Sequence, residues 1–235
     1  KSQTSSCTTD SAIESALSTY AATVVTNRGN YKDVHYSVAQ TGLFEKDYYF
    51  KKRVMLNSIK KYGGFWIGKY EAGFTETPTS SNYNQTTRTV VCRQNAYPYN
   101  YITCANAEIK CESLTNGMAT TSDTKGSLLF GTQWDLTIAY LVKSGAITQA
   151  QATTDSTDWG NYLNKALTIN SSSAKGRSSD TSWPAISGTK ASDTNKMLTT
   201  GAAENTTKKL NIVDLAGNIF ESTMEYDANY SYVCT

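Results

Sequence analysis

The sequence predicts an α+β fold in which long ordered loops outnumber regular elements. Two segments, residues 103–115 and 132–144, begin at a capping residue and then place apolar side chains at helical spacing. Residues 65–70 alternate in the manner of a strand. Residues 148–207 are polar and aperiodic, and a soluble domain seldom holds so long an irregular stretch without using it.

The pattern of residues 10–61 predicts two helices with a weak strand between them. Asp10 stands at the N-cap position of the first helix. Its apolar residues follow at helical spacing: Ile13, Ala16, Leu17, Tyr20, Ala21 and Val24. The second helix covers residues 45–61, before the Gly63-Gly64 turn. The weak strand, residues 31–38, holds the only histidine, His35, for which a surface role is favoured over catalysis because one histidine cannot build a histidine-rich site.

The two central helices have predicted caps and predicted inward faces. The helix at 103–115 begins at Thr103. Its inward residues are Ala105, Ile109 and Leu114. The helix at 132–144 has Thr132 as its cap and Asp135 at the capping-box position. Its core face is formed by Trp134, Ile138, Leu141 and Val142.

A tyrosine-rich segment precedes the first of these helices. Tyr97, Tyr99 and Tyr101 fall within five residues, and such a group forms either a sugar-stacking platform or ordinary packing beneath a loop. Trp183, like Trp159, is expected to anchor the long irregular stretch. The candidate ligand-binding residues are Tyr97, Tyr99, Tyr101 and Trp183.

Composition narrows the classes of protein to consider. The 235 residues suffice for one large domain, or for one of about 175 residues with an N-terminal extension. The formal charge is only +2, which argues against nucleic acid or an anionic membrane as a partner. A surface rich in Tyr, Ser, Thr and Asn is typical of extracellular and paratope-like proteins. No run of apolar residues is long enough to span a membrane.

Five cysteines are spaced without a CxxC motif, so the sequence does not predict a zinc site. Cys104 and Cys111 lie seven residues apart on a predicted helix, about 10 Å along its axis, which is too far for a mutual disulfide. A pairing of Cys92 with one of them stays open. The other two are Cys7 and Cys234.

Residues 210–225 combine apolar side chains with polar groups at fixed places. Asp214 and Glu221 flank the turn-forming pair Gly217-Asn218, and Phe220 is expected to bury the return strand. Two carboxylates and the turn carbonyls form either a polar hairpin or an oxygen cage for a hard cation such as calcium. Glu71, directly after the predicted strand, is interpreted as a buried, hydrogen-bonded structural carboxylate.

Three sequence blocks in the expected order carry a family resemblance. Residues 214–221, Asp-Leu-Ala-Gly-Asn-Ile-Phe-Glu, resemble the Gly-Asn-Val-Trp-Glu-Trp signature of formylglycine-generating-enzyme-like domains. Residues 63–72 resemble the opening strand of that family, and residues 131–135 resemble the start of a helix in its surface and phage members. The resemblance spans about residues 59–233 and implies a C-type-lectin-like fold.

The resemblance also implies domain boundaries, and the chain departs from the family pattern at two positions. Phe220 and Ser222 stand where the family has tryptophan. Residues 1–58 are expected to form an N-terminal helical extension or attachment segment, and residues 59–235 the lectin-like domain. Because the family continues with an Arg-Gly-Gly turn and further strands, the domain is expected to be incomplete at Thr235, with any diversified positions beyond it.

A calcium site is implied by the same resemblance. The family takes side-chain oxygens at the positions of Asp214 and Glu221, and backbone carbonyls at those of Gly217 and Ile219. We expect either a calcium ion there or an internal hydrogen-bond network that replaces it.

Three function classes follow. The enzyme class, a copper-dependent formylglycine-generating oxidase, needs a cysteine pair near the C-terminus, where only Cys234 remains. No catalytic residue is therefore assigned. The second class is a non-enzymatic ligand-binding or adhesion module on a cell surface, pilus, filament or virion, as in the variable proteins of diversity-generating retroelements. Its partner would be a protein or glycan on another cell. The third class is a structural subunit of an extracellular filament or virion, which contacts neighbouring subunits.

Overall fold

A computed structural model describes six stretches of the chain. They are residues 2–23, 45–78, 87–116, 124–179, 181–195 and 197–224. Predictions at residues 31–38, His35, Cys234 and Thr235 lie outside them. The chain forms two compact units that interleave along the sequence. Unit 1 comprises residues 1–67, 128–154 and 222–235, and unit 2 comprises residues 68–127 and 155–221.

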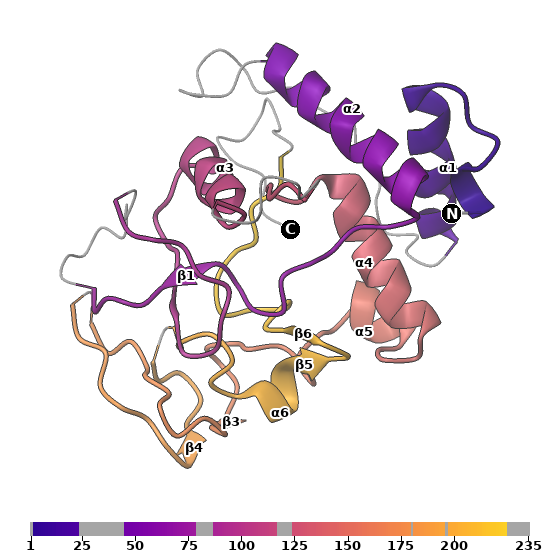
Figure 1. Cartoon of the computed structure of the whole chain (residues 1–235). Helices are drawn as coiled ribbons and strands as arrows, with labels where there is room; N and C mark the ends of the chain where they lie inside the picture. Colours follow the sequence, from indigo (N-terminus) through magenta and orange to yellow (C-terminus); the bar gives the residue numbers. More distant parts are fainter. Residues whose placement is uncertain are drawn as a thin grey trace. The chain divides into compact units, whose positions relative to one another are not determined.

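The described elements are helices and very short antiparallel strands, an α+β content (Figure 1). Unit 1 holds η1 (Ser2–Thr4), α1 (Asp10–Ala22), α2 (Glu45–Tyr62), α4 (Gly131–Lys143) and α5 (Gln149–Thr153). Unit 2 holds β1 (Gly73–Phe74), β2 (Tyr97–Pro98), α3 (Cys104–Ser113), β3 (Leu167–Thr168), β4 (Thr189–Lys190), α6 (Glu204–Thr207), β5 (Lys208–Lys209) and β6 (Ile212–Val213). The strands pair as β1–β2, β3–β4 and β5–β6. The predicted boundary at 58/59 falls inside α2, whereas the units divide at 67/68. Among the helices of the described ranges, none is long and apolar enough to cross a membrane.

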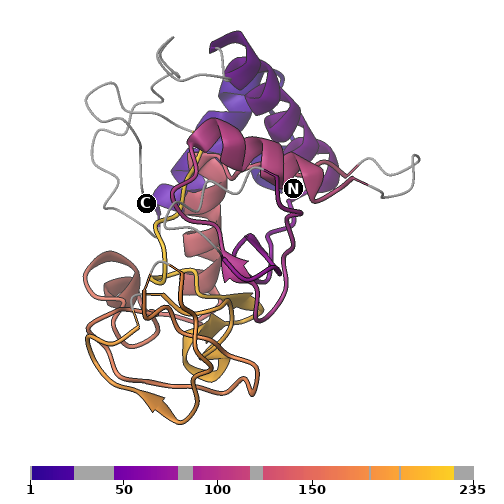
Figure 2. The ribbon, with the colours of Figure 1, turned by 90° about the vertical axis from the view of Figure 1, so that its left-hand side faces the viewer.

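Unit 1 is a helical packing in which α1 lies against both α2 and α4 (Figures 1 and 2). Ile13, Leu17 and Ala21 are buried, which confirms the predicted face of α1. The N-cap is Thr9 and not Asp10, because the Thr9 hydroxyl accepts the Ala12 N–H at 3.2 Å.

Ion pairs join α1 to α2. Lys52, on the buried side of α2, bonds Glu14 at 2.6 Å, and Arg53 bonds Asp10 at 2.8 Å. The first helical residue of α1, predicted as its cap, therefore serves instead in an ion pair.

The cap predicted for α4 is wrong. Thr132 is buried inside the first turn, and the N-cap is Phe130, whose N–H donates to Gln133 Oε1 at 3.0 Å. The Phe130 ring is buried beside Tyr48 of α2, with ring centroids 5.7 Å apart. The N-cap position of α4 is occupied by Phe130 and not by a residue with a hydroxyl group, because its side chain packs in the core. On the predicted core face, Ile138 and Leu141 are buried and Trp134 and Val142 half-buried.

In unit 2, α3 has the predicted cap but a different buried face. Thr103 Oγ1 accepts the Asn106 N–H at 3.3 Å. Ala105 is buried as predicted, but Ile109 is 57% and Leu114 39% exposed. The helix turns the Ala105 and Glu108 side inward, and successive residues are rotated by about 100° on a helix, so Ile109 faces outward.

The structure has no strand at residues 65–70, where one was predicted, and the backbone there is irregular. The first strand after these residues is β1, Gly73–Phe74. The predicted irregular stretch at 148–207 is confirmed as largely loop, and its anchors Trp159 and Trp183 are buried. Backbone hydrogen bonds fix it, such as Arg177 N to Met197 O at 2.8 Å.

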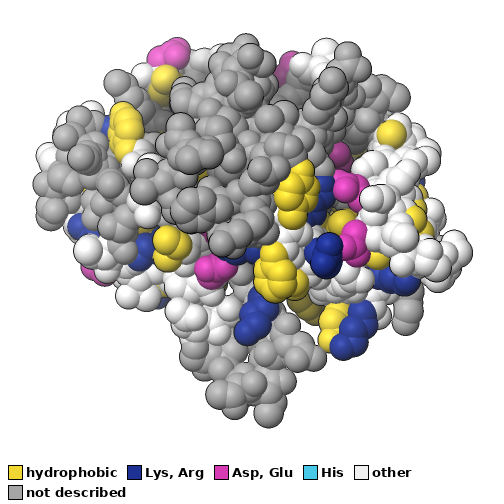
Figure 3. Space-filling model, turned by 90° about the horizontal axis from the view of Figure 1, so that it is seen from above, with side chains coloured by type: hydrophobic (Ala, Val, Ile, Leu, Met, Phe, Trp, Pro, Cys, Tyr) yellow, Lys and Arg dark blue, Asp and Glu magenta, His cyan; other side chains and the backbone are white. Residues whose placement is uncertain are grey.

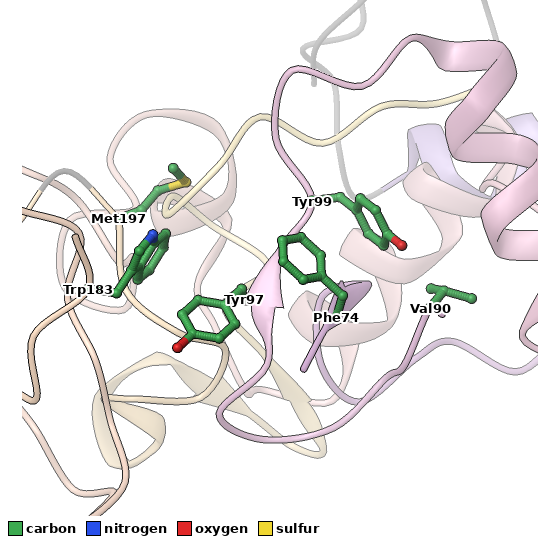
Figure 4. Close-up of a cluster of buried hydrophobic side chains, with 6 residues drawn as sticks. All are labelled: Phe74, Val90, Tyr97, Tyr99, Trp183 and Met197. Atoms are coloured by element: carbon green, nitrogen blue, oxygen red, sulfur yellow. The ribbon is translucent and has the colours of Figure 1, made fainter. Parts of the chain in front are cut away.

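Six buried side chains form what we call the aromatic cluster of unit 2 (Figure 4). They are Phe74, Val90, Tyr97, Tyr99, Trp183 and Met197. The Tyr97 and Trp183 rings meet edge to face with centroids 5.1 Å apart, and Phe74 meets Tyr99 at the same distance. The cluster brings residues from β1, β2 and the irregular stretch into one core.

Candidate functional site

Asp214 directly follows β6 in a left-handed conformation, with φ 58°, and is almost fully buried. Its Oδ2 accepts the Gly201 N–H at 2.7 Å, and its Oδ1 accepts from Asn161 Nδ2 at 3.4 Å. Both oxygens therefore already receive hydrogen bonds from the protein. The carboxylate fixes the turn at Gly201 and the chain at Asn161.

A hydrogen bond from Asn218 links Glu71 to the turn. Its Nδ2 donates to Glu71 Oε2 at 2.7 Å and to the Leu198 carbonyl at 3.2 Å, while its Oδ1 accepts the Leu198 N–H at 2.9 Å. The preceding Gly217 has φ 85°, and a Cβ there would lie 2.5 Å from the Asn161 carbonyl oxygen, so only glycine fits. Asn218 was not among the site residues predicted from sequence, although the Gly-Asn turn signalled its left-handed backbone.

Three carboxylates act on one another at this turn. Burial, followed by the charges of Asp214 and Glu221, raises the pKa of Glu71 well above its ordinary value, and the Asn218 hydrogen bond partly offsets this. Burial and then Asp214 raise the pKa of Glu221 to about 7. Burial also raises the pKa of Asp214, against the Gly201 hydrogen bond, which lowers it. The structure thus brings Asp214 and Glu221 into one neighbourhood and adds Glu71 to them.

Glu71 carries an oxygen that has no partner. The residue is 9% exposed, and Oε1 is buried without a hydrogen bond, whereas Oε2 binds Asn218. The interpretation of Glu71 as a buried, hydrogen-bonded carboxylate is therefore confirmed for one oxygen of two. A buried polar atom without a partner calls for a physical explanation.

The predicted calcium ligands differ in how well they fit a cation. Each oxygen of Asp214 accepts a hydrogen bond from an N–H group, and the Gly217 carbonyl accepts the Ile219 N–H at 2.8 Å. These contacts form an internal network of the kind expected in place of an ion. Glu71 Oε1 and Glu221, by contrast, are acidic oxygens that suit a hard cation. Within the described ranges, no group of three or more His, Cys, Asp or Glu side chains is arranged to hold a metal.

Three of the four candidate ligand-binding residues do not form an exposed sugar-stacking platform. Tyr97, Tyr99 and Trp183 are 3%, 6% and 6% exposed and belong to the aromatic cluster. The two tyrosine hydroxyls are used inside unit 2: Tyr97 accepts from Lys175 Nζ at 2.8 Å, and Tyr99 donates to the Arg88 carbonyl at 3.0 Å. Only the fourth, Tyr101, is exposed, at 64%.

Phe220 was expected to bury the return strand, and the structure contradicts this. Its side chain is 80% exposed, while the neighbouring Ile219 packs against the aromatic cluster. Ile219 is half-buried against the cluster, and the turn that it follows leaves the next side chain, Phe220, in solvent. The space-filling view likewise shows single hydrophobic side chains separated by charged and other polar ones (Figure 3).

The cysteines of the described ranges are free thiols: Cys7, Cys92, Cys104 and Cys111. Cys92 donates to the Tyr70 carbonyl at 3.0 Å. Burial, followed by the charge of Glu108, raises the pKa of Cys111 to about 12. A thiol with so high a pKa is a poor nucleophile, because the thiolate is the reactive form.

Comparison with known proteins adds no relative. A scan against protein-family models, a search of curated proteins and a search of solved structures each returned no match. The likeness to formylglycine-generating-enzyme-like domains rests on the three sequence blocks. The chemistry of the site rests on the geometry given above.

Proposed function

We propose that this chain is a non-enzymatic ligand-binding or adhesion module of an extracellular surface, and that Tyr101 and Phe220 are central to its binding face. The resemblance to lectin-like surface proteins supports the class and the C-type-lectin-like fold. The observation that carries the proposal is the exposure of these two aromatic rings, 64% and 80%, beside a rigid core.

Both residues are next in sequence to residues that pack against the aromatic cluster. Tyr101 lies between Tyr99, inside the aromatic cluster, and Ile102, which packs against it. Phe220 directly follows Ile219, which packs against the same cluster. Aromatic side chains held on a rigid base lose little conformational freedom on binding, so their apolar area contributes more of its free energy to affinity.

The backbone of Tyr101 supports this role. Its φ is 53°, a left-handed conformation that is uncommon for a residue with a bulky side chain. The Asn100 side chain accepts the Tyr101 N–H at 3.0 Å and holds the turn. Strained residues are retained where the surroundings over-determine them, and they cluster at binding sites.

The ligand class follows from the two rings. Exposed aromatic faces bind sugar rings and apolar protein side chains, so the proposed partner is a glycan or protein on another cell. The proposed location is a cell surface, pilus, filament or virion.

The test uses Tyr101→Ala, Phe220→Ser and the double variant on an oligosaccharide array and on intact bacterial cells. Tyr140→Ala, which removes a ring of similar exposure (59%) from α4, is the matched control. We expect the double variant to lose at least about tenfold in affinity, a common effect of removing interface aromatic residues, while the control binds normally. Unchanged binding by the double variant would contradict the proposed face. Failure of the wild-type protein to bind either probe would argue against an adhesion module.

A structural subunit is the second candidate, and one observation favours it. Helix α2, most of which lies in the predicted attachment segment, leaves Phe50, Val54 and Tyr62 exposed by 67%, 48% and 56%. Phe50 and Val54 are one turn apart, so they lie on one face and suit contact with a neighbouring subunit. Sedimentation velocity of the wild-type protein and of a Phe50→Ser, Val54→Ser variant tests it. Self-association that the variant abolishes would favour this candidate.

A further inference from the structure

We propose that residues 65–67 of unit 1 bind an extended segment of another protein, which pairs with them as a β-strand and carries acidic residues at its C-terminal end. The site is separate in sequence from Tyr101 and Phe220. It goes beyond the proposed adhesive function and does not rest on it.

The side chains of residues 65–67 are those of a strand. Phe, Trp and Ile all favour strands, and here their exposure alternates: Phe65 and Ile67 are half-buried, whereas Trp66 is 93% exposed. Such alternation is typical of extended backbone, in which successive side chains point to opposite sides. The segment therefore has the side-chain pattern of a strand, although it is not part of a sheet.

The backbone of this segment has no strand to pair with. Within the part of the chain that the structure describes, no N–H or carbonyl group of residues 65–67 forms a hydrogen bond. On one side, the Gly63 N–H donates to the Ile59 carbonyl at 2.7 Å, and on the other, the Lys69 carbonyl accepts the Val213 N–H at 2.9 Å. A row of unpaired backbone groups between two fixed points is a template for pairing with another chain.

Trp66 supplies the side-chain contact that such a pairing needs. Its exposed fraction is the largest of any large hydrophobic residue in the described ranges. Tryptophan is enriched among the residues that dominate the free energy of binding at interfaces. A strand paired with residues 65–67 places its own side chains beside the Trp66 ring, on the same face, and so gives the ring apolar contact that it lacks in the free chain.

Two glycines leave the start of the segment open. Gly63 follows α2 with φ 84°, a left-handed conformation that ends the helix. A Cβ atom at Gly64 would meet no other atom within 4 Å. A partner strand therefore meets no obstacle at this position.

The charge beside the segment indicates the chemistry of the partner. Residues 60–67 contain two lysines, Lys60 and Lys61, and no acid. Lys60 Nζ donates to the Cys7 carbonyl, a neutral group, so this contact leaves its positive charge in place. In an antiparallel pair, the C-terminal end of the partner strand lies on the side of these lysines. Acidic residues at that end would be attracted to them.

A second copy of this chain fits the edge less well. Antiparallel pairing through residues 65–67 would bring Lys60 and Lys61 of one copy toward Lys69 of the other, and parallel pairing would bring each lysine toward its counterpart. Like charges opposite one another destabilise strand pairs. The partner is therefore a different protein.

The experiment uses the full chain and fluorescently labelled synthetic peptides of alternating valine and threonine. One peptide ends in glutamates at its C-terminus, and a second ends in lysines. A third is the glutamate peptide with N-methyl groups on alternate amides, which removes the N–H donors of one edge. By fluorescence anisotropy, the glutamate peptide should bind saturably and about tenfold more tightly than the lysine peptide. The N-methylated peptide should not bind, because main-chain hydrogen bonds provide the affinity of strand addition.

Variants of the chain separate the ring from the charge. Trp66→Ala should weaken binding of the glutamate peptide by about tenfold, whereas Tyr140→Ala, which removes an exposed ring of α4, should not change it. The double variant Lys60→Gln, Lys61→Gln should lose the preference for glutamate over lysine peptides. Glutamine at position 60 retains an N–H donor for the Cys7 carbonyl. Lys143→Gln, which removes an exposed lysine from the last turn of α4, is the matched control.

Hydrogen exchange followed by mass spectrometry tests the edge directly. The amides of residues 65–67 should exchange rapidly in the free chain and at least about tenfold more slowly with the glutamate peptide bound. Slow exchange in the dilute free chain, or equal binding of the N-methylated peptide, would overturn the inference, as would failure of the glutamate peptide to bind. Protection that instead rises with the concentration of the chain alone would make a second copy the occupant. The Tyr101→Ala and Phe220→Ser variants should bind the peptide normally, which separates this result from that of the proposed function.

Discussion

Unit 1 and unit 2 bury their side chains by different means. In unit 1 the helices α1, α2 and α4 present apolar faces, and Leu17, Leu56 and Leu141 are at most 5% exposed. In unit 2 the strands are two residues long, and the core is the aromatic cluster together with buried polar clamps such as Asp214. Helices satisfy most of their own backbone groups, so the contacts between the helices of unit 1 can be made by side chains alone. Loops do not, so unit 2 uses side chains to hold its backbone.

The largest expected effect is the loss of a ring from the aromatic cluster. Trp183 is 6% exposed and packs on Tyr97, so Trp183→Ala should leave a cavity that unit 2, with its short strands, cannot close by sliding elements together. We expect a loss of about 3–5 kcal/mol in the free energy of unfolding. Urea denaturation followed by circular dichroism measures it.

The control is Leu163→Ala, in the same irregular stretch. Unlike Trp183, Leu163 is 42% exposed. Its truncation should cost less than about 1 kcal/mol. Equal losses for both variants would show that the cluster is not what holds this stretch.

The same contrast explains what could be predicted from sequence. The helices of unit 1 were predictable because Ile13, Leu17 and Ala21 repeat at the helical period, and α2 was predicted within one residue of its end. Outside α3, unit 2 has no such period. Its tryptophan anchors were predictable from size and hydrophobicity alone, but the outward faces of Ile109 and Phe220 depend on packing between distant segments.

Only the local part of the candidate site could be predicted from the sequence, for a related reason. The Gly217-Asn218 turn and its flanking acids are local in sequence, so the pattern revealed them. The partners that decide the chemistry are remote: Glu71 is 147 residues from Asn218, and Asn161 is 53 residues from Asp214. No local pattern indicates that both oxygens of Asp214 accept hydrogen bonds while Glu71 Oε1 accepts none.

The next largest expected effect concerns Lys190, a buried polar side chain that holds the backbone of unit 2. Lys190 is 2% exposed, and its Nζ donates to the carbonyls of Tyr162, Leu163, Ala191 and Thr194 at 3.1–3.4 Å. Lys190→Met would leave these carbonyls without that donor. We expect a loss of about 1–3 kcal/mol, measured by urea denaturation.

Lys125→Met, which removes an exposed lysine of the same unit, is the control and should change stability by less than about 0.5 kcal/mol. Burial lowers the pKa of Lys190, and the charge of Asp193 partly offsets this. If Lys190→Met were as stable as the wild-type protein, the four carbonyls would not depend on the ammonium group.

A further effect is expected from a change of pH. The pKa of Glu221 is 4.5 when unfolded and about 7 in the folded chain, so the folded state holds the extra proton between these values. The stability linked to this group is complete below pH 4.5 and is lost as the pH rises through about 7. In chelator-treated protein the free energy of unfolding should therefore fall between pH 5 and pH 8.

The measurement is a series of urea titrations at four pH values. Glu221→Gln should flatten the decline, because glutamine does not titrate, whereas the exposed-acid control Glu76→Gln should keep it. A free energy of unfolding that rises over this range in the wild-type protein would show that Glu221 is ionised throughout.

The smallest expected effect is a gain in stability at the β5–β6 hairpin. Leu210, one of the two residues between the strands, has φ 54° and is 43% exposed. A left-handed conformation costs a leucine about 1–2 kcal/mol, and glycine avoids this cost but loses more chain entropy on folding. Leu210→Gly should therefore stabilise the chain by about 0.5 kcal/mol and raise Tm by about 1–2 °C. Leu210→Ala keeps the Cβ that causes the strain and should bring no gain. If alanine stabilised the hairpin as much as glycine, the benefit would come from removing exposed apolar surface, and the backbone of Leu210 would not be strained.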